Sequence, residues 1–254
     1  MTRIVKSLKD TLNAGLARFG VRLSSTAVQP WQPTLAAGLQ RLTALNLPLR
    51  TLLDVGAADG GWAGQAAAAL PSCRELLLVE AQAFHRPALA RFQSDCPHAQ
   101  LALAVAGPTC GEVSFDANDP WDGVASQRPR TGGTWVTLPQ TTLDHEVASR
   151  RLTGPFLIKL DVHGYELPIL AGATATLRTT EALIIECYNF ELGGDARRFP
   201  AFCQHMETLG YRCADLWDPT YVGRDNLLWQ FDLLFLRKEF VERGDRPQLP
   251  LASG

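Results

Sequence analysis

The sequence predicts an α/β fold in which an open sheet carries its functional groups at the carboxyl ends of its strands. Two segments, residues 52–62 and 156–173, each read as a short apolar strand that passes through a glycine-containing turn into a helix. Strand-like and helix-like segments also alternate along most of the chain. Because ligands of open α/β sheets bind at the carboxyl ends of the strands, we expect both turns to form the functional site.

Residues 1–48 predict a helical extension and a linker ahead of the core domain. Apolar residues recur at helical spacing from Ile4 to Phe19 with basic residues between them, which indicates a basic amphipathic helix. Residues 24–33 are typical of a linker, and residues 35–45 predict a second helix. Basic amphipathic helices more commonly pack on a domain or a second subunit than on a membrane surface, so the pattern favours a protein contact such as a homodimer over lipid binding.

The core opens with a strand, a glycine turn and a helix, and then a strand that ends in an acid. Gly56 and Gly60 permit close approach of the backbone to a ligand, and the helix predicted over 62–70 directs its first N–H groups to the same place. The next strand, over 76–80, ends at Glu80. An acid roughly 20 residues after the first glycine receives ribose hydroxyls in nucleotide-binding βαβ units. The sequence therefore predicts a ribose-containing ligand.

The later elements continue the alternation to a total of seven strands. They are a helix over 87–96, strands over 101–106, 156–160 and 182–186, a helix from about Glu166, a helix over 199–209, and a final pair of strands over 212–216 and 228–236. Residues 107–133 predict a long irregular loop, and loops of that length are commonly functional. We expect it to contain a lid over the second substrate.

The composition of the first turn decides between ribose-containing ligands. A dinucleotide site needs a second glycine for close approach to the pyrophosphate, but Ala58 stands there and Asp59 adds negative charge. The D-x-G-x-x-x-G pattern is typical of S-adenosylmethionine-dependent methyltransferases, whose ligand carries a sulfonium cation and no phosphate. The residues predicted to contact this cofactor are Asp54, Gly56, Ala57, Asp59, Gly60, Trp62, Glu80 and Ala81.

Six motifs in order resemble those of the FkbM-type methyltransferases. They are residues 54–62, 79–80, 142–144, 158–166 with 170–173, 185–186 and 228–235. The resemblance implies a Rossmann-like methyltransferase fold over residues 49–240, with a seven-stranded, mostly parallel sheet, an antiparallel last strand, helices on both faces, and a tail over 241–254. It also implies transfer of a methyl group to a hydroxyl of a sugar, glycan or polyketide-type small molecule. Two positions depart from the family pattern, which commonly has Asn at Ala58 and Glu at His163.

Methyl transfer to a hydroxyl needs alignment, exclusion of water and a base. Asp161 and Glu186 are predicted to end adjacent strands, with His163 just beyond, so we expect these three catalytic candidates to converge over the methyl group. His163 has the ordinary pKa best suited to a base near neutral pH. The same three side chains would also suit a divalent cation that activates the hydroxyl, although no dense metal-ligand motif is present and no metal ligand is assigned.

Composition favours a soluble cytoplasmic enzyme. Of the 254 residues 46% are hydrophobic and 20% charged, and the net charge of −2 without a run of Lys or Arg argues against a nucleic-acid substrate. The six cysteines form no C-x-x-C pair, which favours reduced thiols. Two alternatives remain: a non-catalytic module that uses the fold to bind proteins, and a nicotinamide-dependent oxidoreductase, which the missing glycine disfavours.

Overall fold

Seven strands form the main sheet of the computed structural model, which describes residues 32–127, 129, 132–192 and 196–243. From edge to edge the strands are β10 (Tyr211–Val222), β11 (Leu227–Arg237), β9 (Thr180–Tyr188), β8 (Phe156–Leu160), β1 (Thr51–Val55), β2 (Glu75–Glu80) and β3 (Ala99–Leu103). Neighbours from β9 to β3 are parallel, and β11, the last strand in sequence, is antiparallel to both of its neighbours. The predicted sheet is confirmed.

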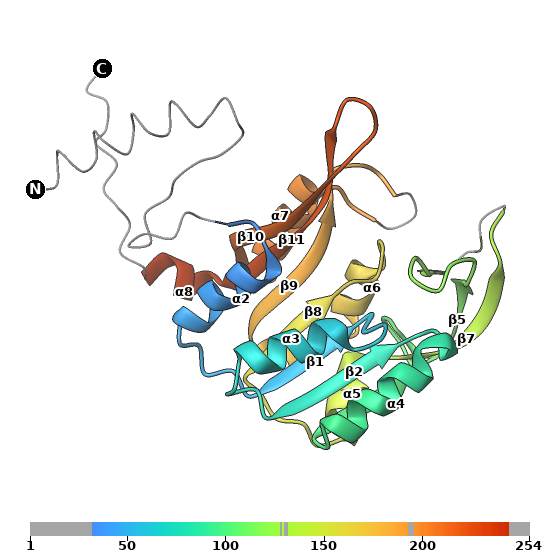
Figure 1. Cartoon of the computed structure of the whole chain (residues 1–254), viewed down its shortest axis with the longest axis horizontal. Helices are drawn as coiled ribbons and strands as arrows, with labels where there is room; N and C mark the ends of the chain where they lie inside the picture. Colours follow the sequence, from blue (N-terminus) through green and yellow to red (C-terminus); the bar gives the residue numbers. More distant parts are fainter. Residues whose placement is uncertain (1–31, 128, 130–131, 193–195, 244–254) are drawn as a thin grey trace, which may run out of the picture. The chain divides into compact units, whose positions relative to one another are not determined.

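Helices cover both faces of this sheet, as Figure 1 shows. On one face lie α2 (Leu35–Ala44), α3 (Gly61–Ala69) and α4 (Arg86–Asp95), and on the other lie α5 (Leu143–Ser149), α6 (Glu166–Ala171) and α7 (Phe199–Thr208). The remaining helices are the short η2 (Ala83–His85) and η3 (Thr176–Thr179), and α8 (Lys238–Arg243). Successive strand residues alternate between the faces, so Leu52 joins one apolar core and Leu53 the other.

The central strands are buried along their whole length. Every residue of β1 and of β8 is buried, as a parallel sheet covered on both faces requires, which is why these strands read as nearly continuous apolar runs. Asp54 in β1 and Lys159 in β8 are the charged exceptions, with exposed fractions of 1% and 2%. Both lie on the face that α2 and α3 cover, close to the carboxyl edge of the sheet.

A second sheet of four strands corrects two predictions. Its strands are, in order, β4 (Val105–Ala106), β7 (Trp135–Thr141), β5 (Gly111–Asp116) and β6 (Val124–Ser126). The strand predicted over 101–106 is wrong at its end, because β3 stops at Leu103 and Val105 pairs in the second sheet. The loop predicted over 107–133 contains two strands, with Val113 and Phe115 buried on one face of β5. The many Gly, Pro and Asp residues around it hid this alternation.

The helix predicted over 35–45 is observed as α2, and the chain from Pro33 onward forms one compact unit, so α2 packs with the sheet. Leu39 and Leu42 are buried in the core on that face. The predicted amphipathic helix between Ile4 and Phe19, nearly all of the predicted linker, and the tail beyond 243 lie outside the described residues. Among the helices that are described, none is long and apolar enough to cross a bilayer.

Candidate active site

The turns that follow β1 and β8 lie against each other at the carboxyl edge of the sheet. Gly56 has a φ of 79°, and a Cβ at this position would overlap the carbonyl oxygen of Asp161. The amide N–H of Asp161 donates to the carbonyl of Val55 at 3.0 Å. Glycine is therefore required here for the close approach of two backbones, and this contact brings the two predicted functional turns together.

Glu80 joins the first turn to the segment after β2. Its Oε2 accepts a hydrogen bond from the N–H of Ala58 at 2.8 Å, and its Oε1 accepts one from the N–H of Gln82 at 2.7 Å. The side chain is 6% exposed and lines a cavity. Each carboxylate oxygen has a second lone pair, so Glu80 keeps acceptor capacity for a ligand while it holds both loops.

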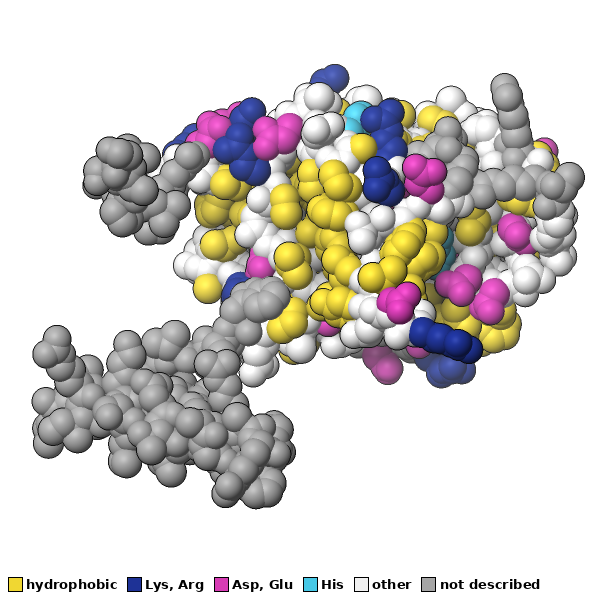
Figure 2. Space-filling view, turned by 90° about the horizontal axis from the view of Figure 1, so that it is seen from above, with side chains coloured by type: hydrophobic (Ala, Val, Ile, Leu, Met, Phe, Trp, Pro, Cys, Tyr) yellow, Lys and Arg dark blue, Asp and Glu magenta, His cyan; other side chains and the backbone are white. Residues whose placement is uncertain are grey.

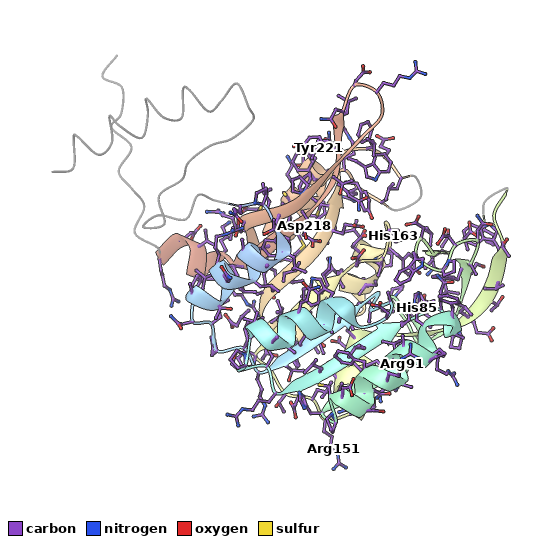
Figure 3. All side chains as sticks on the ribbon, viewed as in Figure 1. His85, Arg91, Arg151, His163, Asp218 and Tyr221 are labelled. Carbon is purple, nitrogen blue, oxygen red and sulfur yellow. The ribbon has the colours of Figure 1, made fainter. Side chains whose placement is uncertain are left out.

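A cavity of 290 Å³ lies over the ends of β1, β2 and β8. Of the residues predicted from sequence, it is lined by Gly56, Glu80, Ala81, Asp161, His163 and Glu186. Figure 3 shows His163 and His85, another lining residue, on the same side of the sheet although they come from different elements. Among the described residues that line this cavity there is no lysine or arginine, so its walls offer acids and no charged partner for a phosphate.

A loop between β5 and β6 covers this cavity. Pro120 and Trp121 line it, and three hydrogen bonds hold the loop to the segment after β2. Gln82 Nε2 donates to the carbonyls of Asp119 and Pro120 at 3.0 and 2.9 Å, and His85 Nε2 donates to the carbonyl of Pro120 at 2.8 Å. The predicted lid therefore borders the cavity next to Glu80.

Asp161, His163 and Glu186 come together as the sequence predicts, although their catalytic roles stay a prediction. His163 Nε2 lies 3.6 Å from Asp161 Oδ1 and 3.7 Å from Glu186 Oε2, with the exposed Asp122 at 3.9 Å. Asp161 follows β8, and Glu186 lies near the end of the neighbouring strand β9. His163 has a left-handed φ of 52°, which turns its side chain back towards these acids.

The two carboxyl groups differ in their affinity for a proton. Burial alone would raise the pKa of Asp161, but the positive charge of Lys159 holds that pKa below its usual value. Burial, followed by the negative charge of Asp161, raises the pKa of Glu186 to about 8. Glu186 accepts hydrogen bonds from the Tyr188 hydroxyl and, at 2.6 Å, from Gln230 Nε2. At neutral pH the pair therefore holds one charge on Asp161 and one proton on Glu186.

A second cavity of 540 Å³ adjoins the first, and His163 lines both. Its aromatic walls are Trp135, Tyr188 and Trp229, and its polar groups include Asp116, Asp122 and Gln230. Trp135 comes from the second sheet, whereas Tyr188 and Trp229 come from β9 and β11 of the main sheet. The site thus has two compartments that meet at one imidazole.

The model of the methyltransferase FkbM domain matches residues 54–213, from the first turn to the start of β10. The chain belongs to the FkbM methyltransferase family. Members of this family are methyltransferases, and the family implies S-adenosylmethionine as the methyl donor. No curated protein matches the chain.

Several solved structures are similar to this chain, each at low sequence identity. A methyltransferase FkbM from Methylobacillus flagellatus KT is 15% identical, with a TM-score of 0.49, over 83% of this chain and 45% of that one. The cofactor-bound protein Rv0187 from MTB is 14% identical, with a TM-score of 0.47, over 86% and 83%. An O-methyltransferase family protein from Burkholderia thailandensis is 10% identical, with a TM-score of 0.43, over 90% and 59%. The chain thus spans less than half the length of the first of these.

Five of the predicted cofactor contacts do not line the cavity beside Glu80. They are Asp54, Ala57, Asp59, Gly60 and Trp62. Asp54 and Ala57 are buried beneath it, Gly60 precedes α3 with a φ of 84°, and Asp59 accepts from the N–H of Gly61 at the start of that helix. Trp62 lies in the first turn of α3. The contact of these five residues with a cofactor stays a prediction.

Other lining residues were not assigned from the sequence. Gln82 and Pro120 lie in no motif that would have marked them, and Tyr165 lies in the motif over 158–166 but was given no role. Ala58 and His163, the two departures from the family pattern, both have left-handed φ values, of 47° and 52°. The left-handed region favours Asn among residues other than glycine, which gives a physical reason for the Asn common at the first of these positions.

Proposed function

We propose that this chain transfers the methyl group of S-adenosylmethionine to a hydroxyl oxygen of a small molecule. The observation that carries the proposal is the pair of adjoining cavities with His163 in the wall of both. The cofactor would occupy the cavity beside Glu80, and the acceptor the aromatic cavity. A hydroxyl at their junction would lie beside the imidazole and against the methyl group.

The cavity beside Glu80 fits a sulfonium nucleoside better than a dinucleotide. Gly56 leaves room for close approach, and Glu80 retains acceptor capacity for ribose hydroxyls. Asp161 supplies negative charge in the wall of the cavity, beside His163. The absence of lysine and arginine among the described lining residues leaves a pyrophosphate without a charged partner. When bound, the cofactor supplies an already activated methyl group. This chemistry favours a methyltransferase over the nicotinamide-dependent oxidoreductase.

Proton removal falls to His163. Its Nε2 faces Asp161 and Glu186, and the carboxylate of Asp161 stabilises the imidazolium that forms when the acceptor's proton arrives. With both ligands bound, the hydroxyl's proton would pass to the imidazole as its oxygen bonds to the methyl carbon. The bond between that carbon and sulfur would break, which leaves S-adenosylhomocysteine. Tyr188 and Gln230 hold Glu186 in place through its two oxygens.

The second cavity suits a ring that carries several hydroxyls. Aromatic faces such as those of Trp135 and Trp229 pack against the apolar faces of sugar rings, while Asp116, Asp122 and Gln230 accept or donate hydrogen bonds at the edges. On the face shown in Figure 2, basic and acidic side chains are interspersed. A mixed surface of this kind favours a small hydroxylated acceptor over a nucleic acid, whose backbone needs a basic track.

One observation favours a second way to activate the hydroxyl. Ligand atoms of Asp161, His163 and Glu186 lie within 4.8 Å of one another, so a divalent cation could take a position between them. The separations of 3.6 and 3.7 Å from Nε2 exceed hydrogen-bond length. Turnover in the presence of EDTA separates the two mechanisms, because a metal-dependent enzyme loses activity and recovers it when Mg²⁺ or Mn²⁺ is added.

The first experiment is calorimetric titration of the purified chain with S-adenosylhomocysteine. We expect saturable binding that Glu80→Ala weakens at least about tenfold, or roughly 1.4 kcal/mol. Glu75→Ala is the matched control, because Glu75 begins the same strand at the opposite edge of the sheet. NAD in place of S-adenosylhomocysteine should give no heat. Binding of NAD alone would support the oxidoreductase, and binding of neither would support the non-catalytic module.

Release of S-adenosylhomocysteine from S-adenosylmethionine with a panel of hydroxylated acceptors then tests the acceptor class. His163→Gln should lower kcat by about 10²–10⁴-fold, the usual contribution of a general base, and should leave affinity for S-adenosylhomocysteine unchanged. Unchanged turnover in His163→Gln would remove this residue from the mechanism.

A further inference from the structure

Among the residues that the structure describes, one lysine is buried, and it lies on the face of the main sheet that α2 and α3 cover. Lys159 is the fourth residue of β8, between the apolar Ile158 and Leu160, and its side chain is 2% exposed. A buried ammonium is costly unless charged partners surround it. Lys159 lies within the motif over residues 158–166, but the motif assigns it no role, so its partners in the fold are informative.

Those partners come from both halves of the site. Lys159 Nζ donates to Asp232 Oδ1 at 2.7 Å and lies 3.3 Å from Asp161 Oδ2. Asp161 is two residues further on, in the turn that follows β8, and lines the proposed cofactor cavity. Asp232 belongs to β11, which carries Trp229 and Gln230 of the second cavity.

The bond to Asp232 passes over an intervening strand. The sheet order places β9 between β8 and β11, and Lys159 is paired with Ile184 of β9. The side chains of Lys159 and Asp232 together therefore span two strand spacings, roughly 9–10 Å from backbone to backbone. Backbone ladders already join each neighbouring pair, but only a long side chain can fix β8 directly against β11.

Both carboxylates that hold Lys159 are engaged on their other side as well. Asp232 Oδ2 accepts from Trp217 Nε1 at 3.2 Å, and Trp217 is fully buried. Asp161 turns its other oxygen, Oδ1, towards His163 Nε2. A continuous chain of polar groups thus leads from Trp217 through Asp232, Lys159 and Asp161 to the imidazole at the junction of the cavities.

We propose that Lys159 is a positioning residue for methyl transfer, which bridges Asp232 and Asp161 and so aligns the acceptor half of the site with the cofactor half. The inference rests on the proposed function. Lys159 touches neither substrate. Lys159 holds Oδ2 of Asp161, so that Oδ1 of Asp161 orients His163. Lys159 also holds Asp232 of β11, which keeps Trp229 and Gln230 of the second cavity in position relative to the imidazole.

Two variants separate positioning from simple charge compensation. Lys159→Met removes the bridge and leaves Asp232 buried without its cation, which by itself can unfold the chain. The double variant Lys159→Met with Asp232→Asn removes both charges of the pair and keeps an acceptor for Trp217. Because only Asp161 then lacks its cation, the double variant is expected to be more stable than Lys159→Met. Lys238→Met is the matched control, because Lys238 pairs with Glu207 on the surface away from both cavities.

The first readout needs no acceptor. Ring NMR signals of His163, assigned by their loss in His163→Gln, are expected to shift and broaden in the folded double variant and to stay unchanged in Lys238→Met. Unchanged His163 signals in the double variant would overturn the proposal, since Asp161 would then hold the imidazole without Lys159.

The second readout is turnover. In the double variant kcat is expected to fall about 10–100-fold, a loss typical of misplaced reacting groups, with affinity for S-adenosylhomocysteine within about threefold of wild type. Full recovery of kcat together with stability would assign Lys159 a purely structural role. Absence of turnover in the wild type with every acceptor would defeat the proposed function. The NMR comparison would still decide whether Lys159 positions Asp161 and His163.

Discussion

At the residue scale, neighbouring acids of this site differ because their surroundings differ. Asp161 lies beside Lys159 and keeps a low pKa, whereas Glu186 is buried beside that negative charge and has a pKa raised to about 8. When the surroundings of two carboxyl groups push their pKa values apart, one group stays charged while the other keeps its proton, so the two can take different roles. The charged Asp161 is thus suited to orient an imidazole, and Glu186 to carry a proton.

Asp54 offers a test of buried charge that needs no substrate. Burial raises its pKa from 3.8 to about 7 although Lys159 opposes the shift. The folded chain therefore holds this proton more tightly than the unfolded chain, and the stabilisation that the proton provides is lost as the pH rises from about 4 through 7. Asp54→Asn has no such loss. Its stability relative to wild type should rise by about 2–3 kcal/mol between pH 5 and pH 8, as measured by urea unfolding without cofactor. An equal difference at both pH values would contradict the shift.

At the scale of elements, the site depends on how α2 and the second sheet pack around the main sheet. Gly38 of α2 faces the indole of Trp217, and a Cβ there would lie 2.5 Å from a ring carbon. Trp217 in turn donates to Asp232, so α2 supports the buried polar chain from outside. The second sheet contributes Trp135 to one cavity and Phe115 to the other.

Gly38→Ala should destabilise the chain by about 1–3 kcal/mol, because the buried indole must move to admit a methyl group. Gly64→Ala is the matched helical control. A Cβ at Gly64 would meet only the ring of Phe92, at an ordinary 3.5 Å, and alanine is the better helix former, so this variant should gain up to about 1 kcal/mol. Chemical unfolding measures both. Equal changes in the two variants would mean that helix propensity, and not the contact with Trp217, decides the outcome.

At the scale of the whole molecule, parallel strands deliver their carboxyl ends to one edge, and both cavities lie there. The residues at the junction come from the turn after β8 and from β9, and Glu80 comes from the end of β2. A ligand that bridges these ends binds only the folded chain. Its binding free energy therefore adds to the stability of the fold.

S-adenosylhomocysteine at a hundred times its Kd should raise Tm by about 5–10 °C, which corresponds to roughly 2.7 kcal/mol for a chain of this size. Thermal unfolding at several ligand concentrations measures the shift. NAD at the same concentration should leave Tm unchanged. Glu80→Ala should reduce the shift at a given concentration of S-adenosylhomocysteine, whereas Glu75→Ala should retain it.

Local chemistry explains which parts of this molecule could be predicted. Gly56, Gly60 and Gly164 mark turns at positive φ, and apolar runs mark buried parallel strands, so the strands and turns that carry the site follow from patterns within short segments. The seven-stranded, mostly parallel sheet and its antiparallel last strand were expected from the family resemblance. The second sheet was missed because its short strands lie among turn residues that dominate the local pattern.

The sequence by itself determined the main strands and helices, the family and the edge of the main sheet where the site lies, since these depend on periodicity, turn residues and motifs within short segments. Only the tertiary structure decided which charges meet. Lys159 and Asp232 are 73 residues apart, and their bond crosses a strand that belongs to neither. Such pairing depends on strand order and register, which long-range packing sets and no local pattern encodes.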